Sequence, residues 1–190
     1  GKDVLTATDE VVSSPAMTSL APGQQQLVRI IVMQPGVRAQ EQSYRLVIDE
    51  LPDATSRAAN PNAVHFLLRY SIPVFIAGNQ DAPASHDALS CEQAEMPATL
   101  RCFNAGNRHI RLSHLEALTA DGQVVGSIKG LAGYVLPGQT TLLPLKQASR
   151  HALSTLRVYL NDDHHASQIP LRPLASRAPV LGTAHAVSPD

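Results

Sequence analysis

The residues of this chain whose types and spacing favour chemistry are its eight histidines, which gather most densely beside two aspartates between Asp162 and His165. Imidazole and carboxylate groups side by side are typical ligands of a divalent transition metal. The group falls between two segments with strand character, however, where a polar turn explains the same residues without a ligand. His109 and His114 are five positions apart, so in a strand their side chains point to opposite faces. The sequence therefore predicts no metal site.

Motifs that carry catalysis are also missing from the sequence. It contains no Gly-x-Ser-x-Gly nucleophile elbow, no Gly-rich phosphate loop and no His-Glu-x-x-His pattern. A hydrolase on a β-sheet scaffold stays open as an alternative, and it would need a cleft holding a histidine or carboxylate with a shifted pKa. The prediction is a protein that is not an enzyme, with no catalytic residues and no cofactor.

The two cysteines, Cys91 and Cys102, flank a turn centred near Met96 and Pro97. In an antiparallel hairpin they would lie roughly opposite each other, which favours a disulfide, and two buried free thiols are the alternative. A disulfide agrees with an oxidising compartment. Two isolated cysteines lack the paired spacing that structural zinc sites use.

The charge balance argues against two classes of partner. Fifteen Lys and Arg residues face sixteen Asp and Glu residues, for a net charge of −1, and no basic patch stands out. Binding of nucleic acid relies on clustered cations, so we expect none. The longest apolar runs, 27–33 and 72–77, fall far short of the roughly 20 residues that a membrane-spanning helix needs. A chain that neither binds nucleic acid nor spans a membrane is predicted.

Strand signals dominate the first 77 residues. Segments 25–34 and 43–51 are rich in β-branched residues and end at proline. The longest candidate is 62–76, where Pro73 and the β-branched and aromatic content oppose a helix. Alternate positions of this segment form a wholly apolar face made of Val64, Phe66, Leu68, Tyr70 and Ile72.

The rest of the chain suggests a second domain. Residues 78–88 are small and polar without a period, which is typical of a linker. Seven short strands separated by turns then indicate a β-sandwich over 89–174, and the pattern fades into a tail at 175–190. The predicted strands are 98–103, 109–118, 123–128, 133–136, 140–145, 155–160 and 167–171.

Four pieces of sequence, in order, resemble the periplasmic chaperones of the chaperone–usher pilus-assembly pathway, specifically the archaic branch. They lie at strands or turns of the predicted fold. The pieces are Ser14-Pro15 with Leu20-Ala21-Pro22-Gly23-Gln24-Gln25 and Leu27-Val28-Arg29-Ile30, then residues 44–52 (YRLVIDELP), 68–75 (LRYSIPVF) and 131–138 (LAGYVLPG).

This resemblance implies an all-β chain of two immunoglobulin-like β-sandwich domains in tandem. The family's chaperones donate a β-strand from their first domain to pilus subunits in the periplasm and deliver them to the outer-membrane usher. The donated strand corresponds here to 62–76, so its apolar face would enter the subunit. The alternative is that this face belongs to the protein's own core. Pilin subunits and the usher are thus the expected partners.

Two departures from the family pattern accompany the resemblance. Better-known branches use a Lys in the donated strand to anchor the subunit's terminal carboxylate, but that position falls at Pro73, which leaves Arg69 as the nearest candidate cation. Residues 1–77 are also short for a sandwich of about 100 residues. We therefore expect an N-terminally truncated, incomplete first domain, and a non-catalytic immunoglobulin-like interaction or adhesion module stays open as the alternative function.

Overall fold

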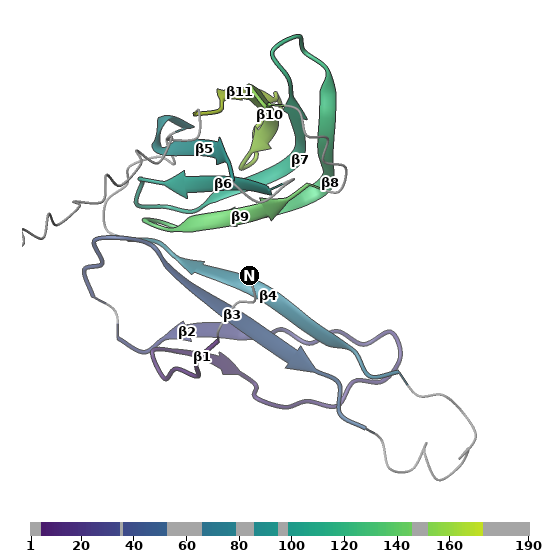
Figure 1. Ribbon diagram of the computed structural model, residues 1–190. Helices are drawn as coiled ribbons and strands as arrows, with labels where there is room; N and C mark the ends of the chain where they lie inside the picture. Colours follow the sequence, from purple (N-terminus) through teal and green to yellow (C-terminus); the bar gives the residue numbers. More distant parts are fainter. Residues whose placement is uncertain are drawn as a thin grey trace, which may run out of the picture. The chain divides into compact units, whose positions relative to one another are not determined.

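The computed structural model describes residues 5–34, 36–52, 66–78, 86–94, 99–145 and 152–172. Eleven β-strands and one 3-10 turn, η1 (His86–Ala88), make up the regular structure of these ranges, which confirms the predicted all-β class (Figure 1). The chain divides into two compact units. The first comprises Gly1–Ala88, Asn104–Ile110 and Leu136–Gln139, and the second comprises Leu89–Phe103, Arg111–Val135 and Thr140–Asp190.

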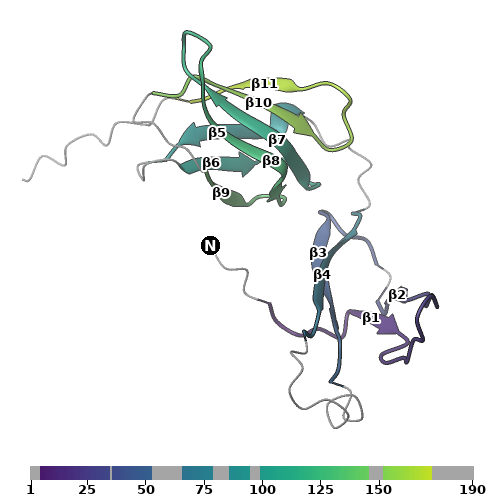
Figure 2. The ribbon, with the colours of Figure 1, turned by 90° about the vertical axis from the view of Figure 1, so that its right-hand side faces the viewer.

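The first unit contains two antiparallel strand pairs. Strand β1 (Val11–Ser14) pairs with β2 (Arg29–Val32), and β3 (Gln42–Asp49) pairs with β4 (Arg69–Ile76). Both views show β3 and β4 side by side along their whole length (Figure 2). A turn lies between β1 and β2, where the Gln24 N–H donates to the Ala21 carbonyl at 3.0 Å and Gly23 takes φ +80°, a value that glycine adopts without strain.

The second unit is a sandwich of two sheets. One sheet has the order β11-β10-β7-β8 and the other β5-β6-β9. The chain just after β11 contacts β5 of the other sheet. There the Arg172 N–H donates to the Cys91 carbonyl, and Glu92 and Arg172 form an isolated parallel β-bridge. The strands are β5 (Leu89–Gln93), β6 (Thr99–Asn104), β7 (Ile110–Leu118), β8 (Val124–Val135), β9 (Thr140–Pro144), β10 (Thr155–Leu160) and β11 (Ser167–Pro170).

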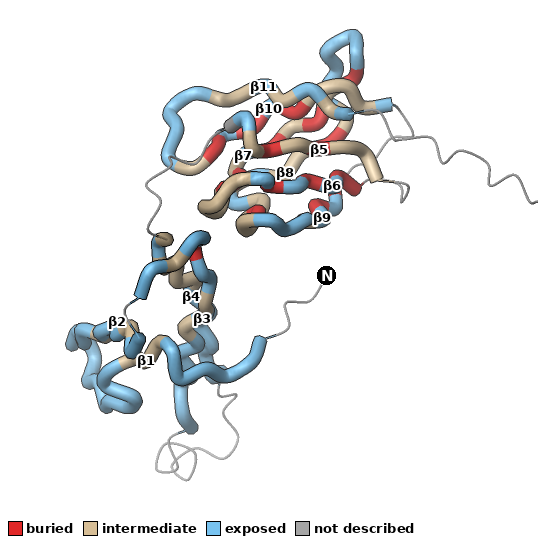
Figure 3. Tube along the Cα trace, turned by 90° about the vertical axis from the view of Figure 1, so that its left-hand side faces the viewer, coloured by how far each residue is buried: buried red, intermediate tan, exposed pale blue. Residues whose placement is uncertain are grey.

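Burial is distributed very unevenly along the chain, as the red and blue segments of Figure 3 show. Every buried apolar side chain of the described residues lies at or after Leu89, and alternate positions of β6, β7 and β10 supply most of them. Among the described residues between 5 and 88, only Glu41 is buried. The core that excludes water is therefore the core of the sandwich, and it comprises Leu89, Cys91, Leu100, Cys102, Ile110, Leu112, Leu115, Ala117, Val135, Leu143, Leu145, Leu156, Val158 and Leu160.

Several predicted strand boundaries were wrong. The segments 123–128 and 133–136 are one strand, β8, because Gly130 (φ +71°) and Gly133 (φ +153°) let the strand bend without ending it. Strands β1 and β5 were missed, since both are short and half polar, and their strand character depends on pairing. The predicted strand 25–34 shrinks to β2. Most of the predicted linker and all of the tail at 175–190 lie outside the described residues.

The structure joins Cys91 on β5 to Cys102 on β6 by a disulfide with an S–S distance of 2.02 Å. Both residues are buried. The bond ties together two strands whose connection includes residues 95–98, which lie outside the described ranges. It crosslinks positions 11 residues apart, so in the loop-entropy account it stabilises the sandwich by about 2–3 kcal/mol.

We expect the double variant Cys91→Ala with Cys102→Ala to unfold at a temperature lower by roughly 10–20 °C, because that free-energy loss is large for a unit of this size. Thermal melting of the full chain followed by circular dichroism measures the shift. Equal melting temperatures for the variant and the oxidised parent would contradict a stabilising role for the disulfide.

Candidate strand-addition site

The ribbon formed by β3 and β4 carries two different faces. Residues directly opposite each other in an antiparallel pair share a face. One face carries Tyr44, Leu46 and Ile48 on β3, opposite Val74, Ile72 and Tyr70 on β4, and we call these six residues the apolar face. The other face carries Ser43, Arg45, Val47 and Asp49, opposite Phe75, Pro73, Ser71 and Arg69. The sequence alternation therefore corresponds to one real surface of the ribbon.

Of the predicted donor residues, the described ones lie on this surface or just before β4, and all of them are exposed. Tyr70 and Ile72 belong to the apolar face of β4, with 56% and 44% of their surface exposed. Phe66 and Leu68 precede the strand and are 82% and 54% exposed. Val64 lies outside the described residues. In this structure these side chains are thus not part of a buried core, which was the alternative left open by the sequence.

Strand β4 begins at Arg69, so the predicted extension of the strand over residues 66–68 was wrong. Its partner β3 ends at Asp49, and the chain then reaches Leu51 and Pro52, which has no N–H to continue the ladder. One further bond is still made, because the Glu50 N–H donates to the Leu68 carbonyl at 2.9 Å. Leu68 therefore remains tied to β3 although it lies outside the strand.

This last bond also shows which way the backbone groups of β4 point. Bonded and non-bonded residue pairs alternate along an antiparallel ladder. Because Glu50 bonds to Leu68, the residues of β4 that bond to β3 are the even-numbered ones, Tyr70 to Ile76. The backbone groups of Arg69, Ser71 and Pro73 therefore point away from β3, and Pro73 occupies a position where β3 needs no N–H donor.

The outer edge of β4 is open in the described part of the chain, where β4 pairs with β3 alone. An edge strand with exposed backbone groups is a template for a further strand. The exposed side chains of Tyr70 and Ile72 alternate along that same strand, and the exposed Leu68 precedes it at the same spacing. The site therefore offers both elements of strand addition: backbone donors and acceptors for affinity, and alternating side chains for pockets.

The half-buried end of the apolar face is linked to the region just before β1. The Tyr44 hydroxyl donates to Glu10 Oε2 at 2.8 Å. Burial raises the pKa of Tyr44 above its usual value, and the hydrogen bond and negative charge of Glu10 add to the shift. Tyr44 and Leu46 are accordingly less exposed than Tyr70 and Ile72 further along the ribbon.

Arg69, the predicted carboxylate anchor, is engaged with a neighbour on the opposite strand. Its guanidinium donates two hydrogen bonds to Asp49, from Nε to Oδ1 at 2.5 Å and from an Nη atom to Oδ2 at 2.8 Å. This bond holds the pKa of the Asp49 carboxyl below its usual value and raises the pKa of Arg69. Both side chains are exposed, so the pair adds little to stability.

We expect Arg69→Ala to raise the pKa of the Asp49 carboxyl toward its ordinary value, because its main stabilising donor is removed. Stability linked to this carboxyl is present above its unfolded-state pKa and is lost as the pH falls through the lower folded-state value. A ¹³C NMR titration of the Asp49 carboxyl in the full chain measures the shift, with Arg157→Ala as the control variant. An unchanged Asp49 titration would show that the ion pair does not persist in solution.

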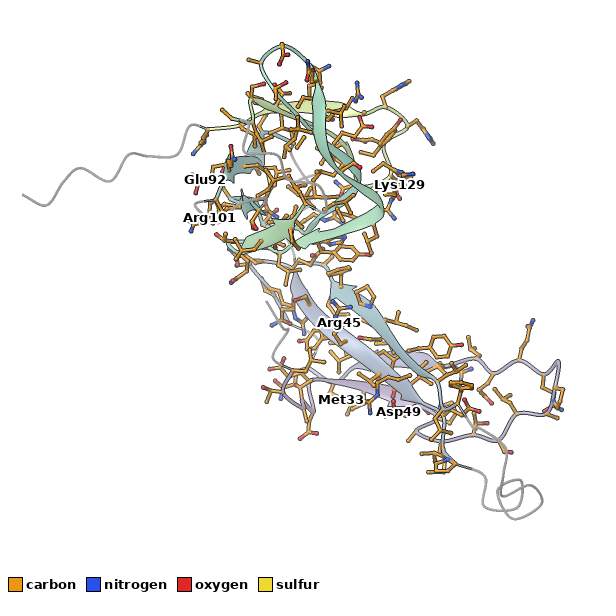
Figure 4. The ribbon with its side chains drawn as sticks, turned by 45° about the vertical axis from the view of Figure 1, so that its right-hand side comes forward. Met33, Arg45, Asp49, Glu92, Arg101 and Lys129 are labelled. Atoms are coloured by element: carbon orange, nitrogen blue, oxygen red, sulfur yellow. A yellow bond between two sulfur atoms is a disulfide. The ribbon has the colours of Figure 1, made fainter. Side chains whose placement is uncertain are left out.

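A cation that the sequence reasoning missed lies closer to Pro73. Arg45 is the residue directly opposite Pro73 in the ladder and projects from β3, as does Asp49 near the end of the same strand (Figure 4). Only pairing register reveals this proximity, because the two residues are 28 positions apart.

The histidine-rich segment at 162–165 follows β10 and forms a turn, as the sequence predicted. Asp162 is engaged by Arg111 at 2.8 Å. Within the described ranges, no cluster of three or more His, Cys, Asp or Glu side chains is placed to hold a metal ion. The same ranges contain no helix with the length and hydropathy needed to cross a membrane.

The described part of the chain is all-β, with a β-sandwich in the second unit and an open strand ribbon in the first. Residues 1–80 match the family model described as "Pili and flagellar-assembly chaperone, PapD N-terminal domain". The expected resemblance to pilus-assembly chaperones of the chaperone–usher pathway is thereby confirmed. No curated protein matches the sequence significantly.

Three solved structures share the fold. The CupB2 chaperone of Pseudomonas aeruginosa is 18% identical with a TM-score of 0.59, over 86% of this chain and 75% of that one. The YadV chaperone is 15% identical with a TM-score of 0.63, over 85% and 79%. CsuC, solved in a pre-assembly complex with the tip adhesion subunit CsuE of the archaic Csu pili of Acinetobacter baumannii, is 22% identical with a TM-score of 0.58, over 88% and 76%.

Proposed function

We propose that this chain is a periplasmic chaperone that binds and caps pilus subunits by donating a β-strand, and that it delivers them to the outer-membrane usher. The family description of residues 1–80 and the three structural matches support this proposal. The function is non-catalytic and uses no cofactor, since strand addition needs only backbone hydrogen bonds and apolar contacts.

The observation that carries the proposal is that β4 is an edge strand with exposed apolar side chains. Its outer edge is unoccupied in the described part of the chain, and its alternating apolar side chains Tyr70 and Ile72 are exposed, together with the preceding Leu68. A subunit strand added to this edge would satisfy the backbone groups of Arg69 and Ser71. It would also bury the apolar side chains, each contributing roughly 1.5–3 kcal/mol when fully covered.

An anchor for the subunit's terminal carboxylate is part of the proposal. Arg69 would have to exchange Asp49 for the incoming carboxylate, because Asp49 already occupies two of its donors. Arg45 lies directly across from Pro73, the position that corresponds to the lysine of better-known branches, and is a second candidate anchor. An arginine at either place can bind a carboxylate through two parallel hydrogen bonds.

Co-export tests the function directly. The full chain and an affinity-tagged pilus subunit are exported to the same periplasm, and the subunit is purified. We expect the chain to co-purify in a one-to-one complex, and its intact mass, with and without reducing agent, identifies the bound form. A subunit that is recovered without the chain would overturn the chaperone proposal in favour of an immunoglobulin-like interaction or adhesion module.

A further inference from the structure

Glu41, the residue before β3, is the one buried residue among the described positions from 5 to 88, and its side chain is 2% exposed. Its Oε1 accepts two hydrogen bonds from a single residue: from the backbone N–H of His109 at 2.9 Å and from the ring Nδ1 at 2.7 Å. The Glu41 N–H in turn donates to the Asn107 carbonyl at 2.9 Å. Since a carboxylate can only accept, Nδ1 of His109 carries the proton in this arrangement.

The imidazole of His109 also contacts β4. The Phe75 ring stacks on it with 3.7 Å between ring centroids and an interplanar angle of 13°. Glu41 precedes β3 and Phe75 lies near the end of β4, so His109 touches both strands at the same end of the ribbon. That end is opposite to the one where Leu68 and Phe66 are exposed.

The segment that carries His109 is itself held firmly. Asn104 is fully buried, and its side-chain amide donates to the Arg108 carbonyl at 2.7 Å and accepts from the Gly106 N–H at 2.8 Å. Its backbone bonds to Gln139 and Gly138, which belong to the same unit. These bonds close the segment that leads to His109.

We propose that Glu41 and His109 are positioning residues that clamp the base of the β3–β4 ribbon and so hold β4 ready to receive a subunit strand. This proposal rests on the proposed function. A buried carboxylate without its donors is costly, so the two strands cannot leave His109 without exposing Glu41 to water. Because the clamp acts at one end, the rest of β4 stays extended and open. Less conformational entropy is therefore lost when a partner binds.

Two substitutions of one residue separate the two contacts of the clamp. His109→Phe keeps an aromatic ring for Phe75 but removes the ring donor to Glu41, and His109→Gln keeps an N–H donor but removes the stack. His114→Phe is the matched control, because His114 is an exposed histidine of the second unit. Hydrogen exchange of the Tyr70, Ile72 and Val74 amides in the full chain reports how firmly β4 is held.

We expect His109→Phe to speed exchange of these three amides by at least about tenfold, the effect of one lost charge-assisted bond. His109→Gln should have a smaller effect, and amides of β7 and β10 should exchange as in the parent. Unchanged β4 exchange in His109→Phe, or an equal rise in every strand, would overturn the positioning role. The rate of capture of a co-exported pilus subunit should fall most in His109→Phe and less in His109→Gln. His114→Phe should capture the subunit at the parent rate.

The exchange measurement and the capture measurement answer separate questions. If the parent chain captures no pilus subunit, the proposed function fails, and the exchange of the three β4 amides still decides whether Glu41 and His109 clamp the ribbon. If the parent captures the subunit and His109→Phe captures it at the same rate despite loosened β4 amides, the clamp has no part in presenting the strand and the proposal is overturned.

Discussion

Leu68→Asp is expected to abolish capture of a co-exported pilus subunit while leaving the chain folded. In the unbound chain Leu68 is 54% exposed, so a carboxylate there remains in water and costs little. In a strand-addition complex the same position would be buried in an apolar groove, where a lost apolar contact and an unpaired charge together cost roughly 4 kcal/mol or more. That loss corresponds to about a thousandfold weaker binding, and Phe66→Asp should behave in the same way.

The matched control for this experiment is Leu131→Asp on β8. Leu131 is an exposed leucine of the second unit, with 56% of its surface accessible, so the substitution has the same chemistry and nearly the same exposure. It should leave capture at the parent level. Capture by Leu68→Asp at the level of Leu131→Asp would exclude the apolar alternation of β4 as the donor surface.

Ser71→Pro tests the backbone of β4 rather than its side chains. The Ser71 N–H points away from β3, so its removal leaves the ladder with β3 intact, and Pro73 shows that the strand accepts proline at such a position. In the complex a subunit carbonyl would lose its donor, and a buried acceptor without a partner costs about 1–3 kcal/mol. We expect subunit binding to weaken by roughly ten- to hundredfold, measured by competition with the parent chain for a limiting amount of co-exported subunit.

Ser71→Ala and Ile72→Pro are the two control variants for Ser71→Pro. Ser71→Ala keeps the N–H and should bind like the parent, whereas Ile72→Pro removes a donor of the ladder to β3 and should loosen the ribbon itself. If Ser71→Pro and Ser71→Ala bind equally well, the subunit does not add to the outer edge of β4.

The alternation of polar and apolar residues was sufficient to predict which side chains share a face. It placed Leu68, Tyr70 and Ile72 on one face, and the register of β3 and β4 gives Tyr70 and Ile72 a common face. It left open whether that face is covered, because exposure depends on what packs against a strand and the strand's own sequence does not specify this. Periodicity likewise found β7 and β10, whose alternate residues are buried in the sandwich.

The parts that escaped prediction depend on contacts between distant positions. Glu41 resembles an ordinary surface carboxylate in the sequence, but in the structure it is buried and bonded to His109, 68 residues later. The sequence predicted two strands where β8 bends at Gly130 and Gly133, since glycines do not reveal whether strand pairing continues through them. The proximity of Arg45 to Pro73 likewise depends on the pairing register of β3 and β4.

The uneven burial of the two units has a consequence for how such a protein can change over time. Exposed positions away from structural contacts usually tolerate substitution within about half a kcal/mol, whereas substitutions at buried positions of the sandwich cost several times more. The candidate contact residues Phe66, Leu68 and Tyr70 belong to the tolerant class. Single substitutions at these positions can therefore change which partner is preferred, while the stability of the sandwich stays the same.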